Sequence, residues 1–187
     1  IAHTSEHWPG GLIDNAWRGR VSDVCVLGLS PDSAEPRLYV EDWLFGAGRP
    51  CILYPDSSKQ KFSADNVLIC WDFSRSAART VSDALPFLHN AKRVNVAVFR
   101  GEKDIPIADP TTPLIAFLKA HGIAVEAKDV VIGKRTIGQA ILEHAETTGV
   151  NLILMGAFGH SRLREFLLGG ATRELLAKST IPILMSH

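Results

Sequence analysis

Residues 66–187 consist of short apolar runs that alternate regularly with amphipathic segments. The apolar runs predict five strands, at 67–71, 94–99, 123–131, 150–155 and 181–185. Apolar residues at helical spacing predict helices between them, at 77–88, 114–121, 137–145 and 172–178. Gly122 is placed to end the second of these helices. Strands that alternate with helices are typical of a parallel sheet covered on both faces, so the pattern predicts an α/β domain.

The segment before this domain resembles the domain's last part. Residues 23–28 are similar to residues 151–156, which lie 128 positions later. An apolar run that begins at Pro50 is similar to one that begins at Pro182, 132 positions later. We interpret this as an internal repeat whose first copy holds only the last strand-helix-strand unit. Such a unit cannot bury both its faces alone, so it must pack on the second domain, on another chain or on residues absent from this sequence.

These patterns divide the chain into three parts. Residues 1–55 form a partial β-α-β repeat, the polar residues 56–63 form a linker, and residues 64–187 form a complete domain. An apolar strand at 181–185 is a candidate edge strand, and exposed edges invite pairing. We expect either a homodimer through this strand or an intrachain pairing with the strand at 51–54.

Charge and hydropathy exclude several classes of partner. Lys plus Arg and Asp plus Glu both number 20, so the formal net charge is zero. A neutral chain lacks the basic footprint used to bind nucleic acid or an anionic membrane. No apolar run approaches the roughly 18 residues that cross a bilayer, and residues 1–10 lack the apolar core of a signal peptide. We therefore expect a cytoplasmic protein.

The sequence offers little metal or redox chemistry. Cys25, Cys51 and Cys70 lie in apolar runs without C-x-x-C spacing, which indicates buried, reduced thiols. Residues 3–7 fit the H-x-x-E-H pattern of some zinc peptidases, but Pro9 follows almost at once, and a solvated terminus is the simpler interpretation. We predict no metal site and no catalytic set of residues.

The most informative stretch is the Gly-rich connection at 156–172, directly after the fourth predicted strand. Glycines let backbone N–H groups approach an anion closely, and Gly169 and Gly170 precede a predicted helix, whose N-terminus favours phosphate. Asp72 follows the first strand at the same edge of the sheet, where ligands of open α/β sheets bind. The stretch is neither a Walker A loop nor a G-x-G-x-x-G fingerprint.

Each of these residues also has a plainer interpretation. Gly156 and Gly159 could serve only in turns, and Asp72 could be a turn or helix-cap residue. His160 could contact a phosphate or simply be exposed. Arg162 and Arg164 could form a solvated helix face.

The spacing of Gly156, Gly159 and Gly169 resembles the G-2x-G-9x-G-[S/T] nucleotide-binding signature of universal stress proteins. The strands at 67–71 and 181–185 are also similar to that family. The resemblance covers residues 66–187, with residues 13–55 as the tail of a degenerate first copy. It implies a Rossmann-like, five-stranded parallel sheet with helices on both faces, and a chain that is part of a tandem protein.

The resemblance also implies where a nucleotide would bind. Family members that bind ATP hold adenosine near the residue equivalent to Asp72, and the end of the second strand contacts the base. The motif glycines line the ribose and phosphates, and the residue before them contributes. Together with the start of the next helix, the predicted nucleotide-binding residues are Asp72, Val98, Phe99, Met155, Gly156, Gly159, His160, Gly169, Gly170 and Ala171.

The chain departs from the family pattern in three places. Gly170 stands where the family has Ser or Thr, which removes a hydroxyl donor to phosphate; Thr172 comes two residues later. Phe99 is bulky and could crowd or stack the base. The loop at 29–36 lacks matching glycines, so we predict no nucleotide site in the first copy.

The expected function is therefore that of a stress-response sensor or regulator that binds ATP or another adenine nucleotide, with or without Mg. A nucleotide-free interaction module of the same fold is the alternative, and Gly170 favours it. Since no general base or nucleophile is evident, any ATP hydrolysis should be slow.

Overall fold

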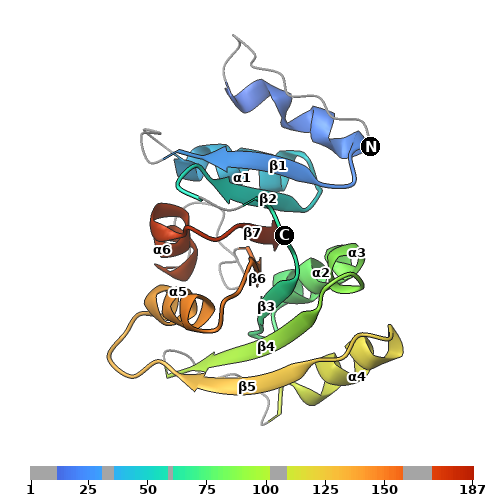
Figure 1. Ribbon diagram of the computed structural model, residues 1–187. Helices are drawn as coiled ribbons and strands as arrows, with labels where there is room; N and C mark the ends of the chain where they lie inside the picture. The colour runs from blue at the N-terminus through green and yellow to red at the C-terminus, as the bar shows by residue number, and fades with distance from the viewer. Residues whose placement is uncertain (1–11, 31–35, 59–60, 102–108, 158–169) are drawn as a thin grey trace.

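The computed structural model describes residues 12–30, 36–58, 61–101, 109–157 and 170–187 (Figure 1). Within them, the strands join into one seven-stranded sheet of order β1-β2-β7-β6-β3-β4-β5. Every neighbouring pair is parallel except β2 and β7. The strands are β1 (Cys25–Leu29), β2 (Cys51–Pro55), β3 (Asn66–Cys70), β4 (Arg93–Arg100), β5 (Glu126–Val131), β6 (Leu152–Gly156) and β7 (Ile183–Ser186).

Helices cover both faces of the sheet, as the sequence predicted. One hydrophobic cluster lies under α1, α5 and α6, and the other lies under α2, α3 and α4. None of the described helices is long and apolar enough to cross a membrane. The helices are the 3-10 helix η1 (Leu12–Val21), α1 (Pro36–Gly46), α2 (Arg75–Asp83), α3 (Leu85–Leu88), α4 (Thr112–Ala120), α5 (Ile137–Thr147) and α6 (Gly170–Lys178).

Two elements differ from the sequence prediction. The helix expected at 77–88 is split into α2 and α3, because Pro86 lacks the N–H that a continuous helix needs there. The strand expected at 123–131 begins only at Glu126. The Ile123 N–H instead donates to the carbonyl of Leu118 as α4 ends, and Gly122 adopts a φ of 74° there, in agreement with its predicted role as a helix terminator.

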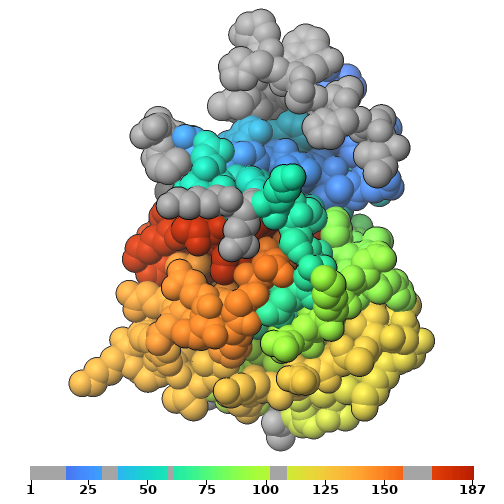
Figure 2. Space-filling view, in the orientation of Figure 1, coloured from blue at the N-terminus to red at the C-terminus, as the bar shows by residue number. Residues whose placement is uncertain are grey.

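The N-terminal segment extends the sheet of the C-terminal unit. Strand β2 pairs antiparallel with β7, with Ile52 opposite Leu184. This is the intrachain pairing that the sequence predicted, and it occupies the edge of β7 that a homodimer would otherwise use. In the space-filling view the two parts form one continuous surface (Figure 2). A β-α-β unit alone would leave one face uncovered, as the sequence predicted. Pairing with β7 covers this face only in part, since Val26 on β1 remains 64% exposed.

The same succession of helix, strand, helix and strand occurs twice, as η1-β1-α1-β2 and as α5-β6-α6-β7. The correspondence extends to single hydrogen bonds. The Cys25 N–H donates to the Pro50 carbonyl at 2.9 Å, and the Ile153 N–H donates to the Pro182 carbonyl at 3.0 Å. These residues match at the offsets of 128 and 132 that the sequence suggested. The two successions share their element order and these hydrogen bonds, and their origin as two copies of one repeat stays a prediction.

Candidate functional site at the switch point of the sheet

The order of the strands creates one point where consecutive connections diverge. Strand β3 lies between β4 and β6. Helix α2, which follows β3, packs on one face of the sheet, whereas α6, which follows β6, packs on the other. Ligands of open α/β sheets bind in the crevice outside the strand ends at such a switch point. The carboxyl ends of β3 and β6 carry the predicted residues Asp72 and Gly156.

Asp72 begins the connection from β3 to α2. One of its carboxylate oxygens, Oδ1, accepts a hydrogen bond from the Ser74 N–H at 3.0 Å. Ser74 is in turn the N-cap of α2, and its Oγ accepts from the Ala77 N–H at 3.1 Å. The turn role considered for Asp72 is therefore present, and it fixes a half-buried carboxylate beside the N-terminus of α2.

The negative charge of Asp72 affects the buried thiol of Cys70. Burial, and secondarily the charge of Asp72, raise the pKa of the Cys70 thiol well above its usual value. Cys70 therefore stays protonated. It is 9% exposed at the end of β3.

Sequence reasoning missed Phe73, which follows Asp72. Its φ of 61° lies in the left-handed region, which residues other than glycine rarely adopt. Its ring is 40% exposed and packs edge-on against Trp71 at a centroid distance of 6.0 Å. Trp71 is anchored by its indole N–H, which donates to the Pro110 carbonyl at 2.6 Å. Strained residues cluster at functional sites, but nothing in the sequence marks a phenylalanine as left-handed.

The predicted residues of β4 point to opposite faces of the sheet. The Val98 side chain is completely buried in the cluster under α2, α3 and α4, so only its backbone could contact a ligand. Phe99 packs on the other cluster, where its ring meets His144 edge-on at 6.1 Å. Because Phe99 packs beside α5, its ring has little freedom to crowd or stack a nucleotide base, the role that the sequence suggested.

The end of β6 lies directly against the first turn of α2. A Cβ on Gly156 would lie 2.7 Å from the Ser76 carbonyl carbon and closer still to the Ala77 amide nitrogen. Gly156 is therefore required for the approach of α2, in addition to any part in ligand binding. Met155 is 8% exposed, so its side chain belongs mainly to the core.

Thr80, also missed from the sequence, ties α2 to the ends of β6 and β7. Its completely buried hydroxyl lies 2.8 Å from the Ser76 carbonyl and 3.2 Å from the Met155 carbonyl, both acceptors. The same oxygen accepts from the Ser186 N–H at 3.1 Å. Nothing in the sequence distinguishes Thr80 from the other polar residues of α2, because its role depends on how α2 packs against the ends of β6 and β7.

We expect Thr80→Val, which keeps the shape and removes the hydroxyl, to lower the free energy of unfolding by about 1–2 kcal/mol, because the buried Ser186 N–H loses its partner. Urea unfolding measures the effect. Ser82→Ala, an exposed change on the same helix, is the control and should stay within about 0.5 kcal/mol of the parent. Equal stability of the two variants would contradict the bridging role.

The predicted site also includes the start of α6. Gly170 is its first residue and is exposed, and no atom of the described residues lies within 4 Å of the place where a Cβ would lie. Ala171 is half-buried and Thr172 is 4% exposed. The Thr172 side chain is thus packed into the protein rather than presented at the helix N-terminus. Gly159, His160 and Gly169, like the H-x-x-E-H segment at 3–7, lie outside the described residues.

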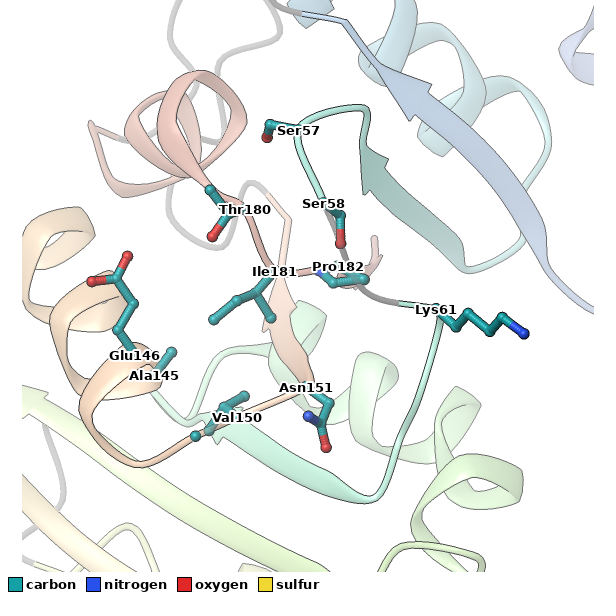
Figure 3. A pocket seen from close by; sticks show the side chains of 11 residues that line it. Ser57, Ser58, Lys61, Ala145, Glu146, Val150, Asn151, Thr180, Ile181 and Pro182 are labelled. Carbon is teal, nitrogen blue, oxygen red and sulfur yellow. The ribbon is translucent and has the colours of Figure 1, made fainter.

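A separate cavity of about 420 Å³ opens at the other ends of the strands, where β6 and β7 begin (Figure 3). Glu146 and the carboxyl end of α5 make its wall negative, and Lys61 extends away from the other labelled side chains (Figure 3). Such surroundings disfavour phosphate, so this cavity is not the predicted nucleotide site. It is lined by Ser57, Ser58, Lys61, Ala145, Glu146, Gly149, Val150, Asn151, Thr180, Ile181 and Pro182.

Among the described residues, no three His, Cys, Asp or Glu side chains are grouped to hold a metal ion. The described residues of the predicted site instead comprise one carboxylate, the first turns of α2 and α6, and glycine backbone. Taken together, these features define an open, Rossmann-like α/β protein with a candidate ligand site at its switch point. Helix N-termini favour anions, while a carboxylate accepts hydrogen bonds from hydroxyl or amino groups.

A sequence model of the Universal stress protein family matches residues 64–187. The chain therefore belongs to the universal stress protein family, as its glycine spacing suggested.

Known relatives agree with this assignment. Universal stress protein Slr1230 of Synechocystis is 28% identical over 142 residues, which cover 73% of this chain and 46% of the relative. Universal stress protein MJ0577 of Methanocaldococcus jannaschii is 33% identical over 66 residues, 34% of this chain and 38% of the relative. The chain thus spans less than half of either relative.

A solved structure supports the fold over almost the whole chain. The universal stress protein from Archaeoglobus fulgidus superposes with a TM-score of 0.70 at 19% identity. The match covers 92% of this chain and 65% of that one. It therefore includes the N-terminal segment as well as residues 64–187.

Proposed function

We propose that the C-terminal unit binds an adenine nucleotide, such as ATP, in the crevice between the ends of β3 and β6. Occupancy of this site would make the protein a sensor or regulator in a stress response rather than a dedicated catalyst. The observation that carries the proposal is the switch point itself, where Asp72 follows β3, Gly156 ends the neighbouring β6, and α2 and α6 pack on opposite faces.

The chemistry of this crevice fits the two ends of a nucleotide. The first N–H groups of a helix have no partner within the helix, and the helix dipole is positive there, so the N-terminus of α6 is suited to phosphates. The carboxylate of Asp72, held by the Ser74 N–H, is suited to accept hydrogen bonds from ribose hydroxyls or an adenine amino group. The family resemblance implies the same assignment of roles.

A nucleotide-free interaction module is the second candidate. One observation favours it: α6 begins with Gly170, which offers no hydroxyl to a phosphate. The two candidates differ in whether any adenine nucleotide stabilises the protein.

We expect ATP with Mg to raise the thermal midpoint in a saturable manner, since ligand at 100 times its dissociation constant stabilises a protein by about 2.7 kcal/mol. Asp72→Asn should reduce the shift, because it retains the oxygen that accepts from Ser74 but loses the charge. Asp65→Asn is the matched control, since Asp65 precedes the opposite end of the same strand and pairs with Lys92. AMP in a parallel titration reports the contribution of the outer phosphates.

The absence of a shift with every adenine nucleotide would reject the nucleotide proposal in favour of the interaction module. A shift that Asp72→Asn and Asp65→Asn reduce equally would place the nucleotide elsewhere on the protein.

A further inference from the structure

Two thiols face each other across the first two strands. Cys25 on β1 is paired directly with Cys51 on β2, and both side chains lie in the same hydrophobic cluster. They are 6% and 0% exposed. Neighbouring strands lie about 4.8 Å apart, and a disulfide needs Cα atoms about 4.4–6.8 Å apart, so the pair can be bridged with little backbone movement.

The C-terminal repeat shows what this position requires for packing alone. Ile153 and Ile183 are paired in the same register on β6 and β7, where the corresponding strands meet. Apolar side chains therefore satisfy the structure at this place. The N-terminal segment instead has a thiol on both strands, which adds a chemistry that packing does not need.

The surroundings make the two thiols unequal. The Cys51 S–H donates to the Arg49 carbonyl at 3.6 Å. The neighbouring Cys51 thiol, and secondarily the charge of Arg49, lower the pKa of Cys25 despite its burial. The pKa of Cys51 is raised by its interaction with Cys25 and by burial. Arg49 is held in place because its guanidinium donates to the Arg20 carbonyl at 2.9 and 3.1 Å. Cys25 is thus the nucleophilic partner, since the thiolate is the reactive form.

Helix η1 packs over the Cys25 thiol. A Cβ on Gly19 would lie 2.7 Å from the Cys25 sulfur, so η1 rests directly on this thiol. The helix is anchored to α1 by the Arg20 Nε–H, which donates to the Gly46 carbonyl at 3.1 Å. Hydrogen bonds of 3-10 helices have poorer geometry than those of α-helices, and local opening of such segments exposes buried groups.

From this geometry we propose that Cys25 and Cys51 form a reversible disulfide when the protein meets a hydroperoxide. The Cys25 thiolate attacks the peroxide, the O–O bond breaks, and Cys25 becomes a sulfenic acid while hydroxide or alkoxide leaves and takes up a proton. The Cys51 sulfur then attacks the Cys25 sulfur, the S–O bond breaks, and water leaves with the Cys51 proton. The two thiols together supply the two electrons that reduce the peroxide, and an external dithiol reverses the reaction.

The test is peptide mapping of the native protein after brief exposure to hydrogen peroxide, quenching by alkylation and digestion with trypsin. We expect the protein to lose the mass of two hydrogen atoms. Peptides 21–37 and 38–59 should be joined, since trypsin does not cut between Arg49 and Pro50. The peptide 62–75, which carries Cys70, should be alkylated in full after unfolding. Treatment with dithiothreitol should separate the joined peptides.

Three single variants refine the test. Cys70→Ser should leave the cross-link unchanged, whereas Cys25→Ser should abolish it. Cys51→Ser should leave a Cys25 sulfenic acid that dimedone captures. The proposal is overturned if the native parent protein yields no joined peptides, or yields them only in denaturant. Oxidation of Cys70 as fast as Cys25 would also overturn it. Both of these outcomes are measured on the parent protein, so they do not depend on whether a variant folds.

Discussion

Replacing Gly156 with alanine should destabilise the protein by about 3 kcal/mol, the upper end of the cost of overpacking. The new methyl group would overlap the backbone of Ser76 and Ala77 in the first turn of α2. Backbone cannot move aside as the tip of a side chain can, so α2 must shift or β6 must bend. The unfolding free energy, measured by urea denaturation, reports the loss.

The matching strand of the N-terminal segment supplies a control for this change. Gly28 occupies the position on β1 that Gly156 occupies on β6, since each is paired with the corresponding residue of the next strand, Tyr54 or Ser186. Among the described residues, a Cβ on Gly28 would meet only the Asp56 carboxylate, at an ordinary 3.6 Å. Gly28→Ala should therefore change stability by less than about 0.5 kcal/mol. Similar losses in the two variants would show that the position on the strand, not the approach of α2, decides the cost.

This comparison illustrates what the sequence could and could not predict. The apolar runs located the strands because side chains of a parallel strand buried on both faces must be apolar, as in β6. The glycine spacing marked the connection after β6. It could not reveal that Gly156 accommodates α2, because that contact joins residues about 80 positions apart in the chain and depends on how closely the helix packs.

Local chemistry explains the other differences. Ser74 was readable as a helix cap, yet the helix was predicted to start later because the polar residues of its first turn break the apolar pattern. Pro86 was a visible breaker within the predicted helix at 77–88. The left-handed backbone of Phe73 and the bridging hydroxyl of Thr80 carry no such local signal, since both follow from tertiary packing around the end of β3.

Gly170→Ser should raise the affinity for ATP by roughly 10- to 150-fold, if the nucleotide lies at the switch point as proposed. A hydrogen bond to a charged group contributes about 1.5–3 kcal/mol, and 1.4 kcal/mol corresponds to a tenfold change in affinity. The substitution restores the hydroxyl that the family signature has after its last glycine. Gly170 is exposed, and none of the residues that the structure describes lies within 4 Å of its Cβ position, so these residues leave space for the hydroxyl. Isothermal titration calorimetry measures the change.

Gly170→Ala separates the hydroxyl from the other effects of losing a glycine. Both variants add a Cβ and restrict the backbone at the start of α6, so both could stabilise the free protein slightly. Only serine adds a donor to a phosphate, so the gain should be absent in the alanine variant and should shrink for adenosine, which has no phosphate. An increase in affinity cannot result from misfolding, so the result for Gly170→Ser is easier to interpret than a loss of stability such as that expected for Gly156→Ala. Equal ATP affinity in the serine and alanine variants would mean that the phosphates do not lie at the N-terminus of α6.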